Sequence, residues 1–341
     1  MKAAAFRRFG GPEVLEYVDL PTPEPHPGNV VIRVRASGVN RLEHYLREGS
    51  VLRNIPLPHI LGSDAAGEIA EVGPGVKTFR AGDRVVPLAG YPLDPNDDEH
   101  APLSAAPSYA IGGIVNWGTY AEYVEVPARW VLPDDTGLEP EKLATLPMVL
   151  VTGVRAVKTV GGVKAGDRVL VHAGASGTGS MNIQIARALG ARVAATVQGA
   201  AQAQVAAALG AEVVVDTQSR DFVKDVLDWT AGRGADVVID NLGGDVLQKS
   251  LDATRTSGTV VAMGFVAGVE VRLHIRNFFF THKRLLGTLM GDLEDFRWGL
   301  QQVKAGRIRP LLDRTLPLSE AAEAHRLIAS NAVKGNLVLK P

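Results

Sequence analysis

The fold is decided by the stretch Arg168-Val-Leu-Val-His-Ala-Gly-Ala-Ser-Gly-Thr-Gly-Ser180, which continues into Met181-Asn-Ile-Gln-Ile-Ala-Arg-Ala-Leu-Gly190. A short apolar run ends in a glycine-rich turn, an amphipathic segment follows, and a second apolar run begins at 192. This order predicts a strand, a tight turn, a helix and a second strand. Free N–H groups at the start of such a helix favour a pyrophosphate, and small turn residues let it approach. The stretch therefore indicates a dinucleotide site, although its glycines (Gly174, Gly177, Gly179) depart from the strict G-x-G-x-x-G pattern.

The alternation of strands and helices continues beyond this stretch. Alternation of this kind is typical of a doubly wound parallel sheet in an α/β protein. Strands are expected at 168–173, 192–197, 212–215, 235–239, 258–263 and 285–289, and helices near 178–189, 200–209, 220–231 and 244–253.

The part of the chain before residue 127 has a different pattern. Short apolar runs at 30–36, 68–72, 84–87 and 119–126 are separated by Gly and Pro turns, which predicts a small β-barrel or sandwich. Residues 88–116 are rich in Pro, Asp, Ala and Gly, and we expect a long surface loop or lobe there. Residues 143–160 are expected to be helical, with Pro147 in the first turn of the helix.

Composition narrows the class of protein. The chain has 341 residues, which favours two domains, and it carries a net charge of −1, which gives no general attraction to nucleic acid or to an anionic membrane. It has no apolar span long enough for a bilayer and no signal-peptide pattern at its start, so a cytoplasmic protein is expected. The absence of cysteine excludes disulfides, thiolate nucleophiles and cysteine-based zinc sites.

The order of motifs along the whole chain resembles the medium-chain dehydrogenase/reductase superfamily, and most closely its zinc-free quinone oxidoreductase branch. The resemblance implies a GroES-like β-barrel catalytic domain at 1–149 and 291–341, with a Rossmann domain at 150–290 inserted between its parts. The motifs that carry it are Gly10-Gly-Pro-Glu-Val-Leu15, Ala36-Ser-Gly-Val-Asn40, Gly62-Ser-Asp-Ala-Ala-Gly67, Glu71-Val-Gly-Pro-Gly-Val76, Gly82-Asp-Arg-Val85, Gly118-Thr-Tyr-Ala-Glu-Tyr-Val124, His172-Ala-Gly-Ala-Ser-Gly-Thr-Gly179, Ala235-Asp-Val-Val-Ile-Asp240 and Gly335-Asn-Leu-Val-Leu339.

The zinc ligands of the superfamily are missing. In zinc-dependent relatives the positions of Asn40 and Ser63 carry a Cys and a His ligand, and a position near Met148 carries another Cys. The 88–116 segment stands where relatives bind a structural zinc with four cysteines, and it has none. Because a tetrahedral zinc site requires about four ligands, we expect no metal. Alcohol oxidation in the superfamily uses zinc to stabilise the alkoxide, so its absence argues against that reaction.

The cofactor expected is NADP(H) rather than NAD(H). An acid after the second strand of the alternating region usually binds the ribose 2′-OH of NAD, and residues 196–203 contain none. NADPH-specific relatives often have basic residues where Gln202 and Gln218 stand here. Arg220 is the nearest remaining cation, and its alternative is an ordinary exposed charge at a helix start.

Three residues are candidates for the chemistry. The resemblance places the amide of Asn40 in the pocket, with a turn residue as the alternative. Tyr45 could donate a hydrogen bond to substrate, or simply pack half-buried. An acid at the position of Asp64 is an outer-shell residue in relatives, and a turn-stabilising Asp is its alternative. His44 is expected to be an exposed helix residue rather than a catalyst.

The cofactor-binding residues come from the glycine turn and from the ends of later strands. Strand ends at 241 and at 264–265 face the ligand crevice in sheets of this kind, with plain turns as the alternative. Thr152 matches a Thr beside the nicotinamide ribose in relatives, or bonds its own helix backbone. Asn336 replaces a Lys often found near the pyrophosphate, and neighbouring Lys334 is a candidate to compensate. The expected set is Thr152, Gly174, Ser176, Gly177, Thr178, Gly179, Thr196, Gln198, Arg220, Asn241, Gly264, Phe265 and Asn336.

The resemblance also implies a homodimer. In relatives two such sheets join edge to edge, and the matching segments here are Val260–Met263 and Val269–Leu273. The aromatic run at 277–282 is expected to be a buried helix or a dimer contact, or else one wall of an apolar substrate pocket.

The first hypothesis is a zinc-independent, NADPH-dependent oxidoreductase that transfers hydride to a quinone or an α,β-unsaturated carbonyl, a small apolar substrate. A reductase of enoyl thioesters or other carbonyls is the alternative enzyme, because pocket shape decides the substrate. An NADPH-binding redox sensor without turnover is the alternative outside enzymes.

Overall fold

The computed structural model describes all 341 residues, and these form two compact units. The first unit comprises residues 1–149 and 310–341, and the second comprises 150–309. The sequence placed the second boundary at 290/291, before helix α9 (Leu293–Lys304), whereas the structure groups α9 with the second unit. The physical reason lies in residues 155–159, where Arg155 pairs with Asp292 at 2.6 Å and Thr159 bonds Asp295 at 2.5 Å.

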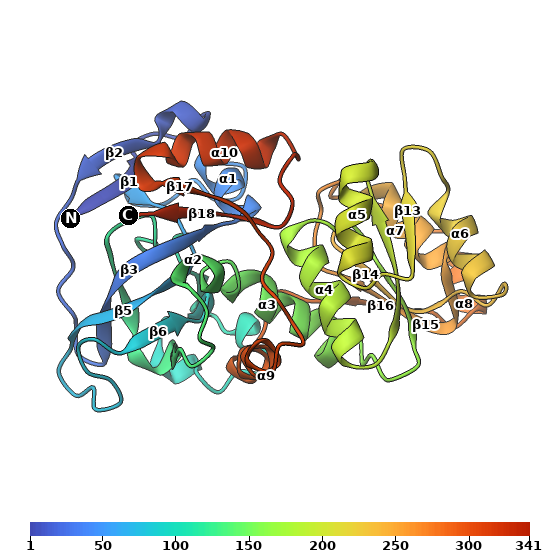
Figure 1. The fold of residues 1–341 in the computed structure, drawn as a ribbon, viewed down its shortest axis with the longest axis horizontal. Helices are drawn as coiled ribbons and strands as arrows, with labels where there is room; N and C mark the ends of the chain where they lie inside the picture. The colour runs from blue at the N-terminus through green and yellow to red at the C-terminus, as the bar shows by residue number, and fades with distance from the viewer. The chain divides into compact units, whose positions relative to one another are not determined.

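The first unit is built around a seven-stranded sheet in the order β10-β6-β5-β3-β18-β17, with β9 also paired to β3 (Figure 1). Strand β3 is its centre and pairs antiparallel with β5, β9 and β18. The last strand of the chain, β18, therefore belongs to the same sheet as β3 from the N-terminal part of the chain. The bounds are β3 (Asn29–Val39), β5 (Asp64–Val72), β6 (Arg84–Pro87), β9 (Tyr123–Pro127), β10 (Val131–Pro133), β17 (Leu312–Pro317) and β18 (Asn336–Lys340).

A smaller three-stranded sheet and three helices complete this unit. The sheet has the order β2-β1-β4, and apolar side chains such as Phe6, Leu46 and Leu337 join it to the larger sheet in one core. The bounds are β1 (Lys2–Phe6), β2 (Glu16–Asp19), β4 (His59–Ile60), α1 (Arg41–Glu48), α2 (Pro140–Leu143) and α10 (Ala321–Ala329).

Residues 88–116 form an ordered lobe rather than a plain surface loop. Strands β7 (Gly90–Pro92) and β8 (Tyr109–Ile111) pair antiparallel within it. Buried Tyr91 stacks on Trp130 with ring centroids 6.2 Å apart. Apolar packing and strand pairing thus hold this lobe without any cysteine.

The second unit is a six-stranded parallel sheet in the order β13-β12-β11-β14-β15-β16, which confirms the predicted doubly wound fold. Strands β11 and β14 are neighbours although two strands separate them in sequence, so the strand order reverses beside β11. The bounds are β11 (Arg168–Val171), β12 (Arg192–Val197), β13 (Val213–Asp216), β14 (Ala235–Asp240), β15 (Thr254–Ala262) and β16 (Arg284–Gly287).

Helices cover the two faces of this sheet. Helices α4 and α5 lie on the face toward the viewer in Figure 1, while α6 and α7 pack on the other face through Phe222, Val226, Leu247 and Leu251. Helix was expected at 143–160, and most of this range is helical. Helix α2 ends at Leu143, and α3 (Pro147–Val154) begins at Pro147 and continues into a π-helical turn (Arg155–Val160). The remaining bounds are α4 (Gly177–Ala188), α5 (Ala200–Ala208), α6 (Phe222–Trp229), α7 (Gly244–Asp252) and α8 (Ile275–Phe280).

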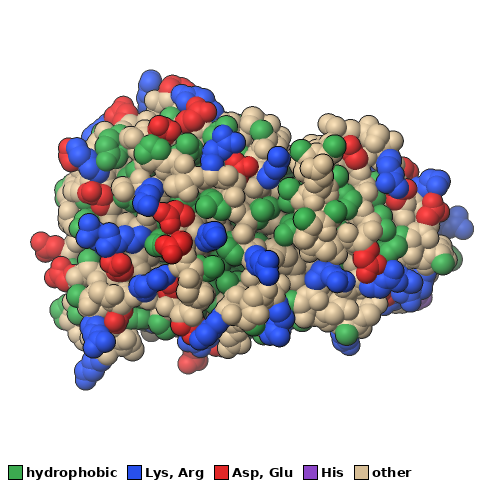
Figure 2. All heavy atoms as spheres, viewed as in Figure 1, with side chains coloured by type: hydrophobic (Ala, Val, Ile, Leu, Met, Phe, Trp, Pro, Cys, Tyr) green, Lys and Arg blue, Asp and Glu red, His purple; other side chains and the backbone are tan.

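Charge is spread evenly on the face shown in Figure 2, where basic and acidic side chains are interspersed over both units. This pattern agrees with the net charge of −1. No helix combines the length and the apolar character that crossing a bilayer requires.

Candidate functional site

The glycine turn after β11 has the geometry of a dinucleotide-binding turn. Helix α4 begins at Gly177, and the hydroxyl of the N-cap Ser176 accepts a hydrogen bond from the Gly179 N–H at 3.0 Å. A Cβ on Gly179 would lie 2.0 Å from the carbonyl oxygen of Ala173, and one on Gly174 would lie 2.9 Å from the Ala195 Cβ. These two glycines are therefore required because the helix and the strands approach each other closely. Gly177 and Thr178 form the first turn of α4, where free N–H groups favour an anion.

Most other predicted cofactor residues lie at the same edge of the sheet. Thr196 is near the end of β12, Asn241 follows β14, and Gly264 and Phe265 follow β15. Because the strands are parallel, their carboxyl ends lie along one edge. A Cβ on Gly264 would lie 2.4 Å from the Asn241 carbonyl oxygen, so these two loops pack directly together.

The polar groups at this edge fit a dinucleotide. The side-chain oxygen of Asn241 is buried without a hydrogen-bond partner, as expected where a ligand supplies one. The glycine turn supplies backbone N–H groups, and no acidic residue occupies 196–203. These residues would hold the pyrophosphate and the adjoining ribose of a nicotinamide cofactor.

Two of the predicted cofactor residues in the second unit have other contacts. The Arg220 guanidinium pairs with Asp225 at 2.9 Å, and its side chain is 52% exposed. The Thr152 hydroxyl lies 3.5 Å from the sulfur of Met290. Gln198 is exposed, just beyond β12.

Asn336 belongs to the first unit, where it begins β18 and is 5% exposed. Its backbone N–H donates to the Leu311 carbonyl at 2.9 Å. The nearby Lys334 is held by its backbone N–H, which donates to Asp313. Both residues thus lie in the first unit, Asn336 at the start of the last strand and Lys334 just before it.

The first unit holds a buried polar cluster around Asp64. Asn40, the N-cap of α1, donates from its amide nitrogen to Asp64 Oδ2 at 3.0 Å and to Ser63 Oγ at 3.2 Å. The Met148 backbone N–H donates to Asp64 Oδ1 at 2.9 Å. Asn40, Ser63 and Met148, which the resemblance assigns to zinc-ligand positions, therefore lie together around Asp64. Both amide hydrogens of Asn40 are already donated here, so the amide orients Asp64 and Ser63.

Sequence reasoning missed Glu43, the second carboxyl group of this cluster. It is 2% exposed, and it accepts hydrogen bonds from the backbone N–H of Asn40 and from the Ser63 hydroxyl, the latter at 3.0 Å. Burial, and then the charge of Asp64, raise the pKa of Glu43 to about 8. Burial raises the pKa of Asp64 to about 7. The spacing Asn40-x-x-Glu43, a capping box, was the signal in the sequence that could have found it.

We call Glu43 and Asp64 the carboxyl pair, and hydrogen bonds extend from it through the unit. The Tyr120 hydroxyl lies 3.5 Å from Glu43 and 3.4 Å from the His325 ring, and the fully buried Arg47 lies 3.3 Å from that ring. Burial lowers the pKa of His325 to about 3.

Two predicted residues of α1 lie beside this network. His44 was expected to be exposed, but its side chain is only 13% exposed because it contacts Arg47 and Glu48. Tyr45 is half-buried, and its ring lies 5.6 Å from that of His44.

The side chains around Asp64 do not fit a zinc ion. The positions that carry ligands in relatives present an amide, a hydroxyl and a thioether, whereas zinc sites use thiolate, imidazole and carboxylate. No group of three or more His, Cys, Asp or Glu side chains in the chain is arranged to hold a metal ion.

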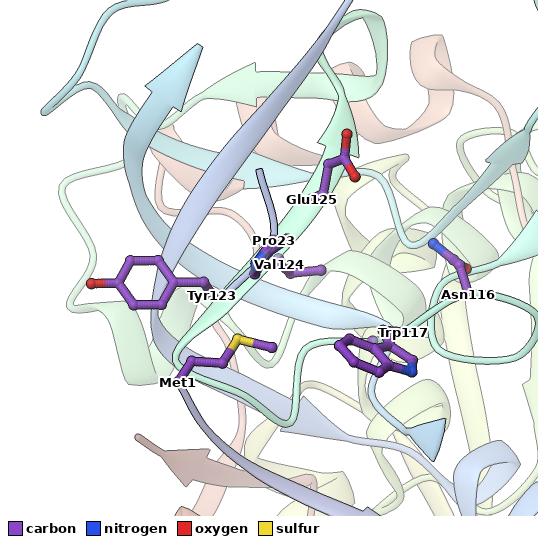
Figure 3. A pocket seen from close by; sticks show the side chains of 8 residues that line it. Met1, Pro23, Asn116, Trp117, Tyr123, Val124 and Glu125 are labelled. Carbon is purple, nitrogen blue, oxygen red and sulfur yellow. The ribbon is translucent and has the colours of Figure 1, made fainter. Parts of the chain in front are cut away.

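A separate cavity of about 140 Å³ lies in the first unit and is shown in Figure 3. None of the predicted site residues lines it. Its acidic residue, Glu125, already accepts hydrogen bonds from His26 and Asn29. The lining residues are Met1, Pro23, Asn116, Trp117, Gly118, Tyr123, Val124 and Glu125.

Two family models match the chain. Residues 26–136 match the family model described as an alcohol dehydrogenase GroES-like domain, and residues 177–305 match the one described as a zinc-binding dehydrogenase. The name of the second family model mentions zinc, but no group of side chains in this chain is arranged to hold a metal ion.

Relatives match over the full length. A quinone oxidoreductase of Pseudomonas aeruginosa is 31% identical and covers 100% of this chain and 99% of its own. A 2-haloacrylate reductase of a Burkholderia species is 33% identical, over 99% of this chain and 98% of its own. The crystal structure of an NAD-dependent alcohol dehydrogenase is similar with a TM-score of 0.93 and 35% identity, over 100% of both chains.

Proposed function

The chain belongs to the medium-chain dehydrogenase/reductase superfamily as a quinone oxidoreductase-like oxidoreductase, and we propose that it reduces quinones or α,β-unsaturated carbonyl compounds with NADPH and without zinc. One observation carries the proposal: the positions of Asn40, Ser63 and Met148, which hold zinc in relatives, form a hydrogen-bonded cluster around Asp64. Two full-length relatives named for reduction of a quinone and of a haloacrylate support the substrate class.

The chemistry needs little from the protein beyond position. A nicotinamide cofactor, when bound, supplies the hydride, and solvent supplies the accompanying proton. The chain must hold the acceptor in place and hydrogen-bond the oxygen that gains negative charge. We assign that hydrogen bond to the Tyr45 hydroxyl, a donor on the helix that follows Asn40. The Asn40 amide itself is engaged with Asp64 and Ser63. The carboxyl pair then fixes the start of α1, and Tyr45 follows Glu43 by two residues on this helix.

NADPH is proposed over NADH because residues 196–203 contain no acid to repel a 2′-phosphate. Arg220 is the cation assigned to that phosphate, and it would have to exchange its ion pair with Asp225 for the ligand. Such an exchange at an exposed site gives a modest preference rather than a strict one.

The test is a turnover assay with the whole protein. We expect loss of reduced-nicotinamide absorbance when NADPH is mixed with a panel of small quinones and enones, and a slower rate with NADH. Enoyl thioesters form a separate arm, and a primary alcohol with NADP⁺ is the negative control. Turnover only with thioesters would select the alternative enzyme, and tight NADPH binding without any turnover would select a redox sensor; either result overturns the proposal.

Zinc independence has its own readout. We expect metal analysis to find far less than one zinc per chain, and a chelator to leave both the rate and the melting temperature unchanged. A stoichiometric zinc content, or a loss of stability on chelation, would contradict this part of the proposal.

We further propose that the protein is a homodimer that buries the apolar surface around the edge strand β16. The predicted edge-to-edge contact through Val260–Met263 is wrong, because β15 lies between β14 and β16. The segment 269–273 forms no strand. The aromatic run at 277–282 was expected to be a buried helix, a dimer contact or a pocket wall, and the exposure of Phe279 and Phe280 argues against the buried helix. The exposed apolar side chains of this region are Phe265, Val266, Val269, Ile275, Phe279, Phe280 and Leu289. Exposed apolar side chains gathered in one stretch of the chain are typical of an interface, and a second copy supplies a matching surface.

Sedimentation of matched variants tests the dimer. Val269, which is 81% exposed, is changed to Asp, and Val51, which is 45% exposed in the first unit, is changed to Asp as the control. We expect Val269→Asp to give monomers while Val51→Asp stays dimeric. A wild-type monomer, or dimers in both variants, would overturn the proposed interface.

A further inference from the structure

We propose that His172 is a positioning residue that locks three loops of the dinucleotide-binding edge together through hydrogen bonds on both of its ring nitrogens. The inference rests on the proposed cofactor function, and it assigns to this imidazole a role in shaping the site rather than in touching the ligand. His172 is the first residue after β11, immediately before the glycine turn.

The contacts of the imidazole are short and fully buried. Its Nδ1 lies 2.9 Å from Thr196 Oγ1, and its Nε2 lies 2.9 Å from Ser250 Oγ. The Ser250 hydroxyl donates to Asp240 Oδ2 at 2.7 Å. None of these four side chains is more than 2% exposed. The Phe222 ring covers the imidazole edge-to-face at 4.9 Å.

The direction of the hydrogen bonds follows from counting donors. Ser250 gives its only hydroxyl hydrogen to Asp240, so its oxygen must accept from His172 Nε2–H. His172 Nδ1 is then the acceptor, and the Thr196 hydroxyl donates to it. The Thr196 oxygen in turn accepts from the Ala173 backbone N–H at 3.2 Å. We call this series, from the Ala173 N–H to Asp240, the imidazole chain.

Each end of the imidazole chain fixes a backbone segment of the cofactor edge. Ala173 opens the glycine turn in a left-handed conformation, with φ at 50°, which a side chain adopts only when held there. Asp240 Oδ1 accepts the backbone N–H groups of Leu242 and Gly243, both at 2.9 Å, and so shapes the loop that carries Asn241. The turn after β11, the end of β12 and the loop after β14 therefore depend on a single neutral tautomer of His172.

The burial of the imidazole supports this tautomer. Burial lowers the pKa of His172, which favours the neutral ring that both accepts and donates. A doubly protonated ring would donate on both sides and leave the Thr196 hydroxyl hydrogen without its acceptor. Sequence reasoning had assigned Thr196 to cofactor contact, whereas its hydroxyl is engaged in the imidazole chain.

The test measures NADPH binding by isothermal titration calorimetry in variants that break the chain away from the ligand. Ser250 lies on α7 in the core, and Ser250→Ala removes the link between His172 and Asp240. We expect it to weaken NADPH binding about tenfold, because a buried hydrogen-bond network loses one partner and leaves two groups unsatisfied. Thr196→Val should weaken binding similarly, and Thr196→Ser, which keeps the hydroxyl, should stay within about twofold of wild type. In turnover, the KM for NADPH should rise while kcat changes little.

Thr230→Val is the matched control. Thr230 is also buried, and its hydroxyl bonds the backbone of Val226 and Gly234 at the opposite, amino end of β14. We expect this variant to lower the melting temperature without changing NADPH affinity. If Ser250→Ala folds poorly, Ser250→Cys replaces it, because a thiol is a weaker donor that keeps the shape.

The double variant Ser250→Ala/Thr196→Val decides whether His172 joins the two positions. These two side chains meet opposite sides of the ring, so their effects on NADPH binding should be strongly non-additive if the imidazole couples them. Additive effects, or Ser250→Ala binding NADPH as tightly as wild type, would overturn the proposal. Failure of the wild-type protein to bind any nicotinamide cofactor would instead overturn the proposed function from which it starts.

Discussion

Each of the two units buries a polar cluster that contains carboxyl groups, and the two clusters accommodate these groups differently. The imidazole chain of the second unit has one carboxyl group, Asp240, and three donors face it. The carboxyl pair of the first unit places Glu43 and Asp64 around the shared partners Asn40 and Ser63. A buried carboxyl group is costly unless it is paired or hydrogen-bonded, and both clusters supply donors. They differ because the second unit buries one carboxyl group, whereas the first unit buries two close together, where burial raises both pKa values.

The two clusters depend on different physical properties. The imidazole chain depends on geometry, because each hydrogen bond has one allowed direction and one short distance. The carboxyl pair depends on pH, because its pKa values of about 7 and 8 lie near neutrality. A substitution that displaces the backbone should therefore impair the second unit, and a rise in pH should lower the stability of the first.

The largest effect is expected from Gly179→Ala in the second unit. The added Cβ would lie 2.0 Å from the Ala173 carbonyl oxygen, so the turn or α4 must shift. Overpacking of this kind costs about 3 kcal/mol of unfolding free energy, and displacement of the turn should abolish measurable NADPH binding. Urea unfolding and calorimetric titration measure the two effects.

Gly112→Ala is the control for this prediction. Its added Cβ would lie 3.6 Å from the nearest atom, an ordinary contact, and it is far in sequence from the turn. We expect NADPH binding and stability near those of wild type. Normal NADPH binding by Gly179→Ala would show that the turn tolerates displacement and that the second unit does not depend on geometry as argued.

The fold and the cofactor edge could be predicted from sequence because their signals are local. The alternation of short apolar runs with helical segments predicted all six strands, and the glycine spacing predicted the turn. The imidazole chain could not be predicted, because Ser250 lies 78 residues from His172 and only the register of β11 and β14 brings them together. Glu43 was overlooked for another reason. An acid at the third helical position normally indicates a cap, and the burial of Glu43 depends on its packing near β5, which is distant in sequence.

The second prediction concerns pH and the first unit. The folded pKa values of Glu43 and Asp64 are raised above their usual 4.5 and 3.8, so the folded state binds protons more tightly than the unfolded state. This stabilisation is complete below about pH 4 and is lost as the pH rises through about 7 to 8. The unfolding free energy should therefore fall between about pH 5 and 8, by at most about 1.4 kcal/mol per pH unit for each group. Urea unfolding at a series of pH values measures the slope.

Glu43→Gln should remove about half of that slope, since the amide keeps the shape but cannot titrate. Glu68→Gln is the matched control, because Glu68 is a surface partner of Arg35 with a lowered pKa. It should leave the slope between pH 5 and 8 unchanged. An unaltered slope in Glu43→Gln would mean that the carboxyl pair holds no extra proton, and the contrast between the two clusters would fail.

The smallest effect is expected from Arg220→Ala, which asks whether the cofactor edge depends on charge as well as geometry. Arg220 is half-exposed and paired with Asp225, so its contact with a 2′-phosphate should be worth about two- to fivefold in NADPH affinity. NADH has no 2′-phosphate, and its affinity should not change. Arg192→Ala is the control: this Arg is also half-exposed, pairs with Glu212 and begins β12 at the opposite end of the sheet. Equal losses for NADPH and NADH in Arg220→Ala would exclude Arg220 from phosphate recognition, and cofactor choice would then rest on the missing acid alone.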